Sequence, residues 1–488
     1  MAKVEKEMGK LEGLKPERVF YYFEELTKIP RESYNEEQVS NYIKSVGEDL
    51  GLETIQDDLL NVIIRKPASP GYENAEGVII QGHMDMVCEK ESDSEHDFQK
   101  DPISLIVDGD YICADKTTLG ADNGIAIAMG LAILEDNTLQ HPAIEFLATS
   151  SEETEMDGAL GLAEDALKGT RFLNLDSEEE GVVIAGSAGG ELIKIEIQST
   201  YEELQDSMGF DIEIKGLMGG HSGMEINKPR ENANKILGNL LKELAERMEI
   251  RLISITGGTK DNAIPRSARA KVALVQEDRV QFENIMEEIK GRVIEKNKGK
   301  EPGIDISVER CETVTQGFSK NTLKSVVELL ENLPTGVFTM LEGYDNIVES
   351  SSNLAIIKTE DEKITVQISL RSSIERRLKE MEALIIKEAD KINAVYTIGA
   401  SYPEWEYRPD SNLRKIAMAV YEHVFGVKME AAVIHAGLEC GAMAKKYPNM
   451  DLISFGPNIY DVHTPKEKIS ISSTKRIYEY TVALLKSL

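Results

Sequence analysis

The sequence predicts an α/β protein whose central, mostly parallel sheet is flanked by helices, with an α+β domain inserted into it. Two observations predict this class. Over residues 1–190, short apolar runs alternate with helical stretches, as they do in proteins with a parallel sheet. Over residues 191–401, apolar and charged residues alternate with a period of two, which is typical of a half-solvated antiparallel sheet.

The first part contains four apolar runs of strand length. They are NVIIRK (61–66), GVIIQG (77–82), AIEFLAT (143–149) and FLNLD (172–176). Between the second and the third of these runs, GIAIAMGLAILED (124–136) is typical of a buried helix. We therefore expect strands and helices to alternate along this part of the chain, as they do in βαβ units.

The pattern changes twice along the rest of the chain. The run LIKIEIQ (192–198) alternates apolar and charged residues, and ENANKILGNLLKELAERM (231–248) is an amphipathic helix. After residue 402 the chain returns to helix and to an apolar strand, DLISFGP (451–457). We predict one discontinuous domain, made of residues 1–190 and 402–488, and one inserted domain, made of residues 191–401.

Size and charge restrict the class of protein. At 488 residues the chain exceeds the size of a single core, so two or more domains are expected. Its net charge of −31 disfavours binding to nucleic acid or to an anionic membrane. No run approaches the roughly 18 apolar residues of a membrane span. The charged N-terminus has no signal-peptide core, and the four cysteines form no CxxC pair, so a reducing, cytoplasmic location is expected.

Acidic residues and histidines follow several of the expected strands. In an open α/β sheet, ligands bind beyond the carboxyl ends of the strands. Asp85 lies just after the second run, and Glu152 lies just after the third. The candidate metal ligands at these strand ends and nearby are His83, Asp122, Glu153, Asp176 and His463. Each is weak evidence when taken alone, since Asp122 could simply be a helix N-cap.

A divalent cation explains the combination. Unpaired carboxylates would repel one another and would be costly to bury, and a cation offsets that cost. Nitrogen and carboxylate ligands without thiolates suit zinc, manganese or cobalt. Five ligands exceed the roughly three that one catalytic zinc takes, so the set suits two divalent metal ions with Asp122 as the bridging ligand.

Two further acidic residues lie beside the candidate ligands. Glu152 directly precedes Glu153, and adjacent side chains can point in different directions. Glu152 can therefore act as the general base on a metal-bound water while Glu153 binds metal. Asp85 lies two residues after His83, on the same side of an extended backbone, and can accept the second imidazole N–H. The simpler alternative for His83 and Asp85 is a turn with two polar residues.

The motifs GHMDMV, LGADNGIAIA, SSEETEMDGALGL, NLDSEE and DVHTPKE resemble, in order and spacing, those of the aminoacylhistidine dipeptidases. These are also called Xaa-His dipeptidases, or carnosinase-like peptidase D, and belong to the di-zinc aminopeptidase and deacylase clan. The resemblance covers nearly the whole chain and shows no departure at the metal positions. It implies a catalytic domain with an inserted lid domain, two divalent metals, the same five ligands, and Asp85 with Glu152 as the catalytic pair.

The resemblance also assigns roles in the lid domain. His221, in GLMGGHSG, matches a histidine that stabilises the scissile carbonyl oxygen as it becomes an oxyanion. It leaves open whether His221 acts in its own subunit or across a homodimer formed through the lid domain. Asn262, in GGTKDNAIPR, matches an asparagine near the substrate. Arg371, in ISLRSS, is either a bidentate ligand of the substrate's C-terminal carboxylate or a surface strand arginine.

The segment IHAGLECG holds His435 and Glu439, which are four residues apart. On a helix the two would share one face and could form a metal pair. The resemblance favours a glycine-rich loop that shapes the substrate pocket, with both residues in substrate binding.

We therefore predict a di-metal dipeptidase for small peptide substrates, preferentially Xaa-His dipeptides, with β-Ala-His as one candidate. The reaction would use a metal-activated water with Glu152 as general base. The main alternative is a tripeptidase or an N-acyl amino acid deacylase on the same scaffold, because motifs do not encode the shape of a substrate pocket. A metal-binding protein without turnover is the third alternative. The sequence determines neither the metal nor the oligomeric state.

Overall fold

The computed structural model describes residues 9–341 and 347–488. Residues 1–8, part of the N-terminus that we expect to lack a signal core, lie outside the described residues. Contacts divide the chain into two compact units. Unit 1 comprises Met1–Ser187, Trp405–Val433 and Leu438–Leu488, and unit 2 comprises Ala188–Glu404 and Ile434–Gly437. The division into domains at residues 191 and 401 stays a prediction.

Unit 1 is built on an eight-stranded sheet with the order β1-β2-β6-β3-β7-β23-β8-β22. The predicted parallel arrangement is present in the centre, where β6, β3, β7 and β23 run parallel. β1, β2 and β8 pair antiparallel toward the sides. The strands span Glu53–Gln56 (β1), Val62–Lys66 (β2), Val78–His83 (β3), Ile144–Thr149 (β6), Arg171–Asn174 (β7), Val182–Ser187 (β8), Glu430–Ile434 (β22) and Asp451–Ser454 (β23).

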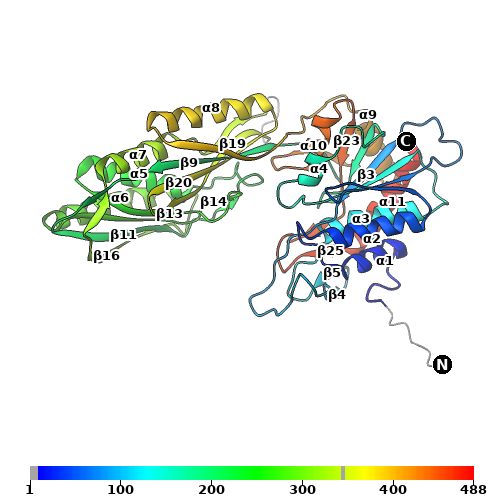
Figure 1. The fold of residues 1–488 in the computed structure, drawn as a ribbon, viewed down its shortest axis with the longest axis horizontal. Helices are drawn as coiled ribbons and strands as arrows, with labels where there is room; N and C mark the ends of the chain where they lie inside the picture. The colour runs from blue at the N-terminus through cyan, green and yellow to red at the C-terminus, as the bar shows by residue number, and fades with distance from the viewer. Residues whose placement is uncertain (1–8, 342–346) are drawn as a thin grey trace. The chain divides into compact units, whose positions relative to one another are not determined.

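Helices flank this sheet. α1, α3, α9 and α11 pack with it into one hydrophobic core that includes Phe20, Phe146 and Tyr480. α4 and α10 contact each other and lie across the sheet from α1, α2 and α3 (Figure 1). The helices span Glu17–Leu26 (α1), Glu37–Asp49 (α2), Ala121–Glu135 (α3), Asp157–Gly161 (α4), Asn412–Phe425 (α9), Glu439–Lys446 (α10) and Ile471–Ser487 (α11). α3 is buried on nearly every side, which is what its uniformly apolar sequence predicts.

A smaller sheet in unit 1 has four antiparallel strands in the order β24-β25-β5-β4. Its strands span Leu105–Asp108 (β4), Tyr111–Ala114 (β5), Ile459–Tyr460 (β24) and Lys468–Ser470 (β25). The turn between β24 and β25 carries His463, so this sheet determines where that histidine lies.

Unit 2 contains a nine-stranded sheet with the order β16-β11-β15-β13-β19-β20-β9-β21, and β18 pairs with β19. Its pairings are antiparallel, as the period-two alternation predicts. The strands span Gly189–Gln198 (β9), Ser207–Lys215 (β11), Arg251–Gly257 (β13), Ala268–Val275 (β15), Asp305–Thr313 (β16), Gly336–Met340 (β18), Val348–Thr359 (β19), Lys363–Ser372 (β20) and Val395–Tyr402 (β21).

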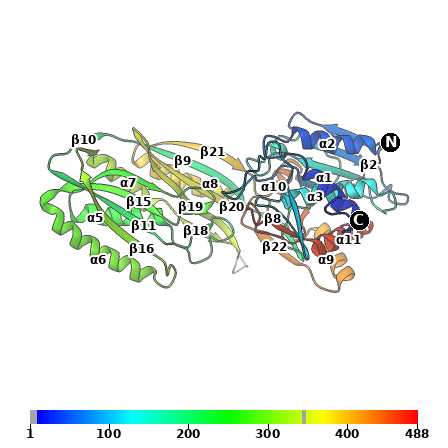
Figure 2. The same cartoon turned by 90° about the horizontal axis from the view of Figure 1, so that it is seen from below.

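Four helices cover one face of this second sheet (Figures 1 and 2). They span Ala233–Arg247 (α5), Arg279–Asn297 (α6), Lys320–Asn332 (α7) and Glu375–Lys391 (α8). All four contribute to one hydrophobic core, in which Phe210 of β11 packs against Phe282 of α6 at a centroid distance of 4.4 Å. The core therefore lies between the helices and a single face of the sheet.

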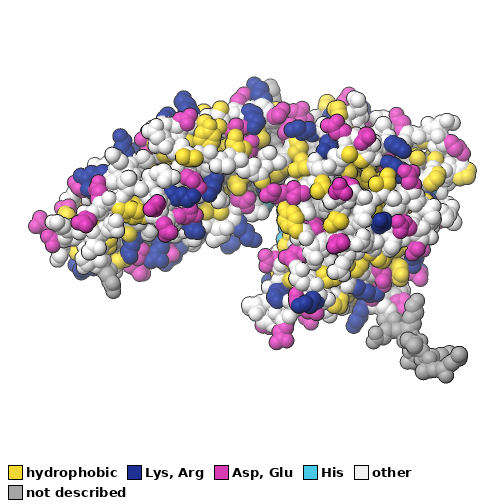
Figure 3. Space-filling model, in the orientation of Figure 1, with side chains coloured by type: hydrophobic (Ala, Val, Ile, Leu, Met, Phe, Trp, Pro, Cys, Tyr) yellow, Lys and Arg dark blue, Asp and Glu magenta, His cyan; other side chains and the backbone are white. Residues whose placement is uncertain are grey.

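The surface and the cysteines bear on the predicted environment. On the face drawn in Figure 3, acidic and basic side chains are interspersed over both units. Among residues 9–341 and 347–488, no helix has both the length and the apolar character needed to cross a membrane. Cys88, Cys113, Cys311 and Cys440 are all free thiols.

Candidate metal centre

Three neighbouring parallel strands bring their carboxyl ends to one edge of the unit 1 sheet. β3 ends at His83, Glu152 and Glu153 follow β6, and Asp176 follows β7. β3 lies between β6 and β7 and pairs in parallel with both. The side chains that follow these strands therefore emerge next to one another.

Asp122 and His463 reach the same place from other elements. Asp122 lies in the first turn of α3, where the backbone departs from helical geometry. Asp122 stands between the two histidines of the cluster: its Oδ1 is 3.2 Å from Nε2 of His83, and its Oδ2 is 3.1 Å from Nε2 of His463. One carboxylate thus faces both imidazoles.

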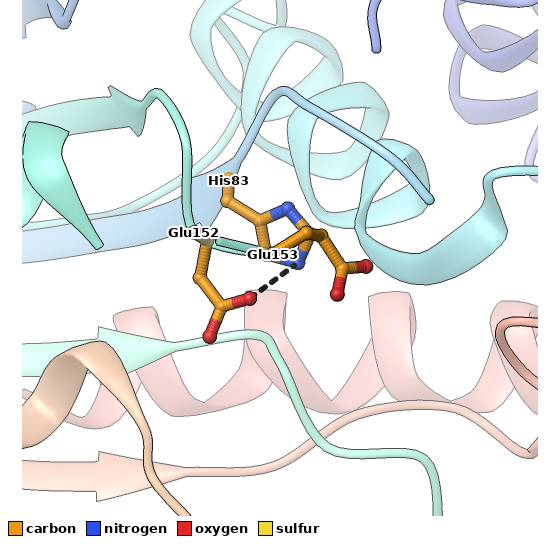
Figure 4. A group of neighbouring side chains, drawn as sticks. All are labelled: His83, Glu152 and Glu153. Atoms are coloured by element: carbon orange, nitrogen blue, oxygen red, sulfur yellow. Dashed lines mark ion pairs between the residues drawn. The ribbon is translucent and has the colours of Figure 1, made fainter. Parts of the chain in front are cut away.

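The other carboxylates complete two groups around Asp122. Oδ1 of Asp176 is 3.5 Å from Nε2 of His83, and the Glu153 carboxylate is 3.0 Å from Nε2 of His463. Three sets of side chains have potential ligand atoms within 4.8 Å of one another: His83 with Asp122 and Asp176, Asp122 with Glu153 and His463, and His83 with Glu152 and Glu153. Figure 4 shows the last set, in which Oε2 of Glu152 is 3.9 Å from Nε2 of His83.

The electrostatics of the cluster fit divalent cations. Burial would lower the pKa of His463, but Asp122 and Glu153 beside it raise it to about 11. Burial and the charge of Asp122 raise the pKa of Glu153 to about 7. Positive charge is therefore favoured at the cluster, and divalent cations would supply it. Its donors are imidazole nitrogens and carboxylate oxygens, which zinc, manganese and cobalt accept.

Glu152 differs from the other carboxylates of the cluster. Its side chain is 13% exposed and faces the His83 ring. Burial raises the pKa of Glu152 well above its usual range; the charge of His83 opposes this, and Asp176 and Glu153 add to it. A buried carboxyl group with a raised pKa beside other titratable groups is typical of residues that act in general acid–base chemistry.

Asp85 contacts both the His83 ring and the turn that holds Glu152 and Glu153. Its Oδ1 lies 3.3 Å from Nδ1 of His83. Its carboxylate also accepts the backbone N–H groups of Glu152 and Glu153, each at 3.1 Å, and the hydroxyl of Ser33 at 2.8 Å. Burial would raise the pKa of Asp85, but these hydrogen bonds, that of His83 above all, lower it. Asp85 is therefore an ionised group that fixes the orientation of its neighbours.

Sequence reasoning missed several residues that support the site. Ser33 and Glu36 precede α2, and Glu36 accepts both the N–H of Ser151 at 2.9 Å and its hydroxyl at 2.8 Å. Arg31 and Glu467 hydrogen-bond to the backbone around the ligands. Nothing in the residues around position 31 indicates these contacts. For Glu467 the signal was its place in DVHTPKE, four residues after His463.

Glu439 is the first residue of α10 and is fully buried in unit 1. Its Oε2 accepts hydrogen bonds from Nε2 of Gln81 at 2.5 Å and from the hydroxyl of Thr149 at 2.8 Å. Burial raises the pKa of Glu439 to about 8. The role in substrate binding predicted for Glu439 stays a prediction.

His221 and Asn262 lie together in unit 2. His221 belongs to β12 (Gly220–His221), which pairs with β14 (Ala263–Ile264) directly after Asn262. Nδ1 of His221 accepts backbone N–H groups from Gly223 at 3.2 Å and from Met224 at 3.0 Å. Since Nδ1 accepts, a neutral ring carries its proton on Nε2, and this N–H can donate to an oxygen atom.

Arg371 and His435 are also part of unit 2. Arg371 is 8% exposed, which excludes the alternative of a surface arginine; its Nη1 donates to the Tyr402 hydroxyl at 2.8 Å. His435 precedes α10 instead of lying on a helix with Glu439, so the helical metal pair is excluded as well. Nε2 of His435 lies 2.7 Å from the Ser351 hydroxyl. Burial, then the charge of Arg371, lowers the pKa of His435 to about 3, so this ring is neutral.

Known proteins resemble this chain over nearly its whole length. The family model described as peptidase family M20/M25/M40 matches residues 79–487. The chain is 36% identical to the cytosol non-specific dipeptidase of Escherichia coli over 487 residues, which is 99% of each chain. It is 37% identical to the aminoacylhistidine dipeptidase of Vibrio alginolyticus, whose crystal structure matches with a TM-score of 0.87 over 98% of each chain. The aminopeptidase PepT of Bacillus cereus, 15% identical with a TM-score of 0.57 over 97% of this chain and 99% of its own, shares the fold.

Proposed function

This chain is a member of peptidase family M20/M25/M40, and from that premise we propose that it is a dipeptidase that works with two divalent metal ions. The relatives support the substrate class, because one is named a non-specific dipeptidase and another an aminoacylhistidine dipeptidase. We take dipeptides as the substrates, with a preference for Xaa-His that includes β-Ala-His. The name of the Escherichia coli relative also supports a cytosolic location.

The observation that carries the proposal is the place of Asp122 between two imidazoles, at 3.2 Å and 3.1 Å from His83 and His463. Asp176 would complete the group around His83, and Glu153 would complete the group around His463. The metal is zinc in this proposal, with manganese or cobalt as substitutes. Two bound ions would polarise the scissile carbonyl and lower the pKa of a water molecule.

Glu152 is the general base of the proposal. Its carboxyl group would take the proton of the attacking water and return it to the leaving amine. The environment of Glu152 supports this role, because burial beside the cluster raises the pKa of its carboxyl group, as is common for groups in acid–base catalysis. Asp85 would hold His83 in one orientation and would fix the 152–153 turn through its two backbone hydrogen bonds.

The residues of unit 2 would bind and polarise the substrate. His221 would donate its Nε2 proton to the carbonyl oxygen as negative charge develops there, and Asn262, on the neighbouring strand pair, would contact the substrate. Arg371 would hold the C-terminal carboxylate through its planar fork, with the neutral His435 beside it. A homodimer through unit 2 stays part of the proposal, and sedimentation of the purified chain tests it.

A panel of substrates tests the proposed function. Purified protein, loaded with zinc, would be given Xaa-His dipeptides, other dipeptides, tripeptides and N-acyl amino acids, each with and without a chelator. We expect release of free amine from dipeptides, fastest for Xaa-His, and its loss in chelator. Cleavage limited to tripeptides or acyl amino acids would show that dipeptides are not the substrate class. A zinc-loaded protein that cleaves none of these compounds would contradict an enzymatic role.

A further inference from the structure

A single peptide segment in unit 1 is held from both sides by buried charged groups. The segment is 119–122, which ends at Asp122, the carboxylate between the two histidines. Arg31 contacts it from one side and Glu467 from the other, and each of these residues is 2% exposed. Burying a guanidinium and a carboxylate is costly unless each is fully hydrogen-bonded, so these contacts call for an explanation.

Arg31 links this segment to the end of β3. Its Nη1 donates to the carbonyl oxygens of Met84 at 2.9 Å and Asp85 at 3.1 Å. Its Nη2 donates to the carbonyl oxygen of Gly120. The planar fork of a guanidinium can reach both stretches at once. Arg31 therefore fixes the spacing between the backbone that follows His83 and the backbone that precedes Asp122.

Glu467 links the same segment to the turn that carries His463. Its Oε2 accepts the N–H groups of Leu119 at 2.7 Å and Gly120 at 2.9 Å. Its Oε1 accepts those of Ala121 at 2.8 Å and Asp122 at 3.2 Å. A carboxylate at the start of a helix is favourable by itself, since it meets unpaired N–H groups. Here it also ties a turn from the far end of the chain to the start of α3.

The segment has little room to move between these two groups. Gly120 has a φ of +70°, a conformation that side chains other than glycine rarely adopt. A Cβ atom at this position would clash with Nη2 of Arg31 and would lie 2.7 Å from Sδ of Met86. Burial lowers the pKa of Arg31, and the charge of Glu467 opposes this most strongly, so the two residues also offset each other's charge.

We propose that Arg31 and Glu467 are positioning residues that set the place of Asp122 relative to His83 and His463 before any metal ion binds. The proposal rests on the two-metal site of the proposed function and does not depend on the substrate. Arg31 lies outside residues 79–487, the span that the family model matches, so this support comes from the N-terminal part of the chain. A purely structural role would affect stability alone.

A pair of matched variants separates the two roles. In Glu467→Gln, the side-chain amide would point N–H donors at backbone N–H groups, and about half of the four hydrogen bonds would be lost. Glu145→Gln is the control. Glu145 is also buried, with Oε2 accepting the N–H groups of Lys168 and Gly169, both at 2.7 Å, but it lies at the start of β6, the end away from the metal centre.

Both variants would be stripped of metal and titrated with Co²⁺, with affinity read by calorimetry and ligand geometry by the absorption spectrum. We expect Glu467→Gln to bind Co²⁺ about 10- to 100-fold more weakly, with an altered spectrum. Glu145→Gln should keep the Co²⁺ affinity and the spectrum of the unaltered protein, even where its melting temperature falls as much as that of Glu467→Gln. Unchanged Co²⁺ affinity and spectrum in Glu467→Gln would overturn the proposal. Because metal binding is read directly, these results stand whether or not any dipeptide is cleaved.

A measurement on the unaltered chain covers the case in which Glu467→Gln does not fold. Hydrogen exchange would be followed at the amides of residues 119–122, with and without metal. We expect equal protection in both states, since Glu467 accepts these N–H groups without help from an ion. Exchange that is fast in the metal-free protein and slow only after metal binding would show that the ions order the segment, and would also overturn the proposal.

Discussion

The carboxylate of Asp85 and the ring of His83 are in contact: Oδ1 lies 3.3 Å from Nδ1, while Nε2 on the other side of the ring faces Asp122 at 3.2 Å. The imidazole is therefore held between two carboxylates. A proton on Nδ1 satisfies Asp85 and leaves the Nε2 lone pair free for a metal ion. The orientation of this predicted ligand is thus fixed from within unit 1.

Replacement of Asp85 by asparagine tests this relationship. The asparagine side chain would lack the charge that favours a proton on Nδ1, while the backbone carbonyl oxygen of residue 85, 3.2 Å from Nδ1, would still accept a hydrogen bond from it. We expect metal affinity or dipeptide turnover to fall about 10- to 100-fold. Ser33→Ala is the control, because it removes one hydrogen bond to Asp85 and leaves the charge of Asp85 in place. Its metal affinity or turnover should fall less than in Asp85→Asn. Equal behaviour of Asp85→Asn and the unaltered protein in zinc titration and in turnover would contradict the assigned role.

Glu152→Gln should separate metal binding from turnover. Glutamine keeps the size of the side chain but cannot take a proton from water. We expect bound zinc to stay at the unaltered level while turnover falls about 10²- to 10⁴-fold. The close approach of Glu152 to His83 allows the alternative that Glu152 is itself a ligand. Loss of zinc from Glu152→Gln, measured by elemental analysis, would favour that alternative, and Glu153→Gln serves as the comparison in which zinc loss is expected.

Metal binding should raise the melting temperature of the protein. The metal-free cluster places several buried carboxylates close together, and an ion that binds only the folded chain stabilises it by about 2.7 kcal/mol at 100 times its dissociation constant. We expect a clear upward shift with zinc in calorimetry and its reversal with chelator. Asp122→Asn should lose most of that shift, because Asp122 faces both histidines. A shift of full size in Asp122→Asn would mean that the ions bind elsewhere.

Part of the site could be predicted because one rule governs it. His83 ends one strand of the parallel sheet, Glu153 and Asp176 follow two others, and the carboxyl ends of such strands share an edge. The parallel centre of the sheet follows from the alternation of strands with helices. The antiparallel outer strands, β1 and β2, could not be predicted in the same way, since short apolar runs carry no sign of their direction.

The contacts of the supporting residues could not be predicted, for a physical reason, although the place of Glu467 in DVHTPKE pointed to that residue. Glu467 is one of 86 acidic residues in the sequence, and only the tertiary fold determines that it is buried against residues 119–122. Arg31 is separated by more than fifty residues from each carbonyl oxygen that it contacts. Neither residue belongs to a periodic pattern. Hydrogen bonds of this kind are visible only when distant segments are already in place.

Acid should destabilise the protein through His435, and the sign follows from its pKa. The folded pKa is about 3, because burial and then Arg371 disfavour the charged ring, whereas an unfolded histidine has a pKa of about 6.5. Above pH 6.5 both states are neutral, and His435 adds no pH dependence. Between pH 6.5 and pH 3 the unfolded chain binds a proton that the folded chain does not, so stability falls as the pH falls.

His435→Gln removes this effect, because glutamine does not titrate in that range. We expect the unaltered protein to lose stability relative to the variant by up to about 1.4 kcal/mol for each pH unit below 6.5. Thermal unfolding in chelator from pH 7.5 to pH 5 measures the difference. His423→Gln, at an exposed position of α9, is the matched control and should follow the unaltered protein. If stability falls equally with pH in His435→Gln and in the unaltered protein, His435 is protonated in the folded chain at acid pH. The proposed carboxylate site would then not contain a neutral ring.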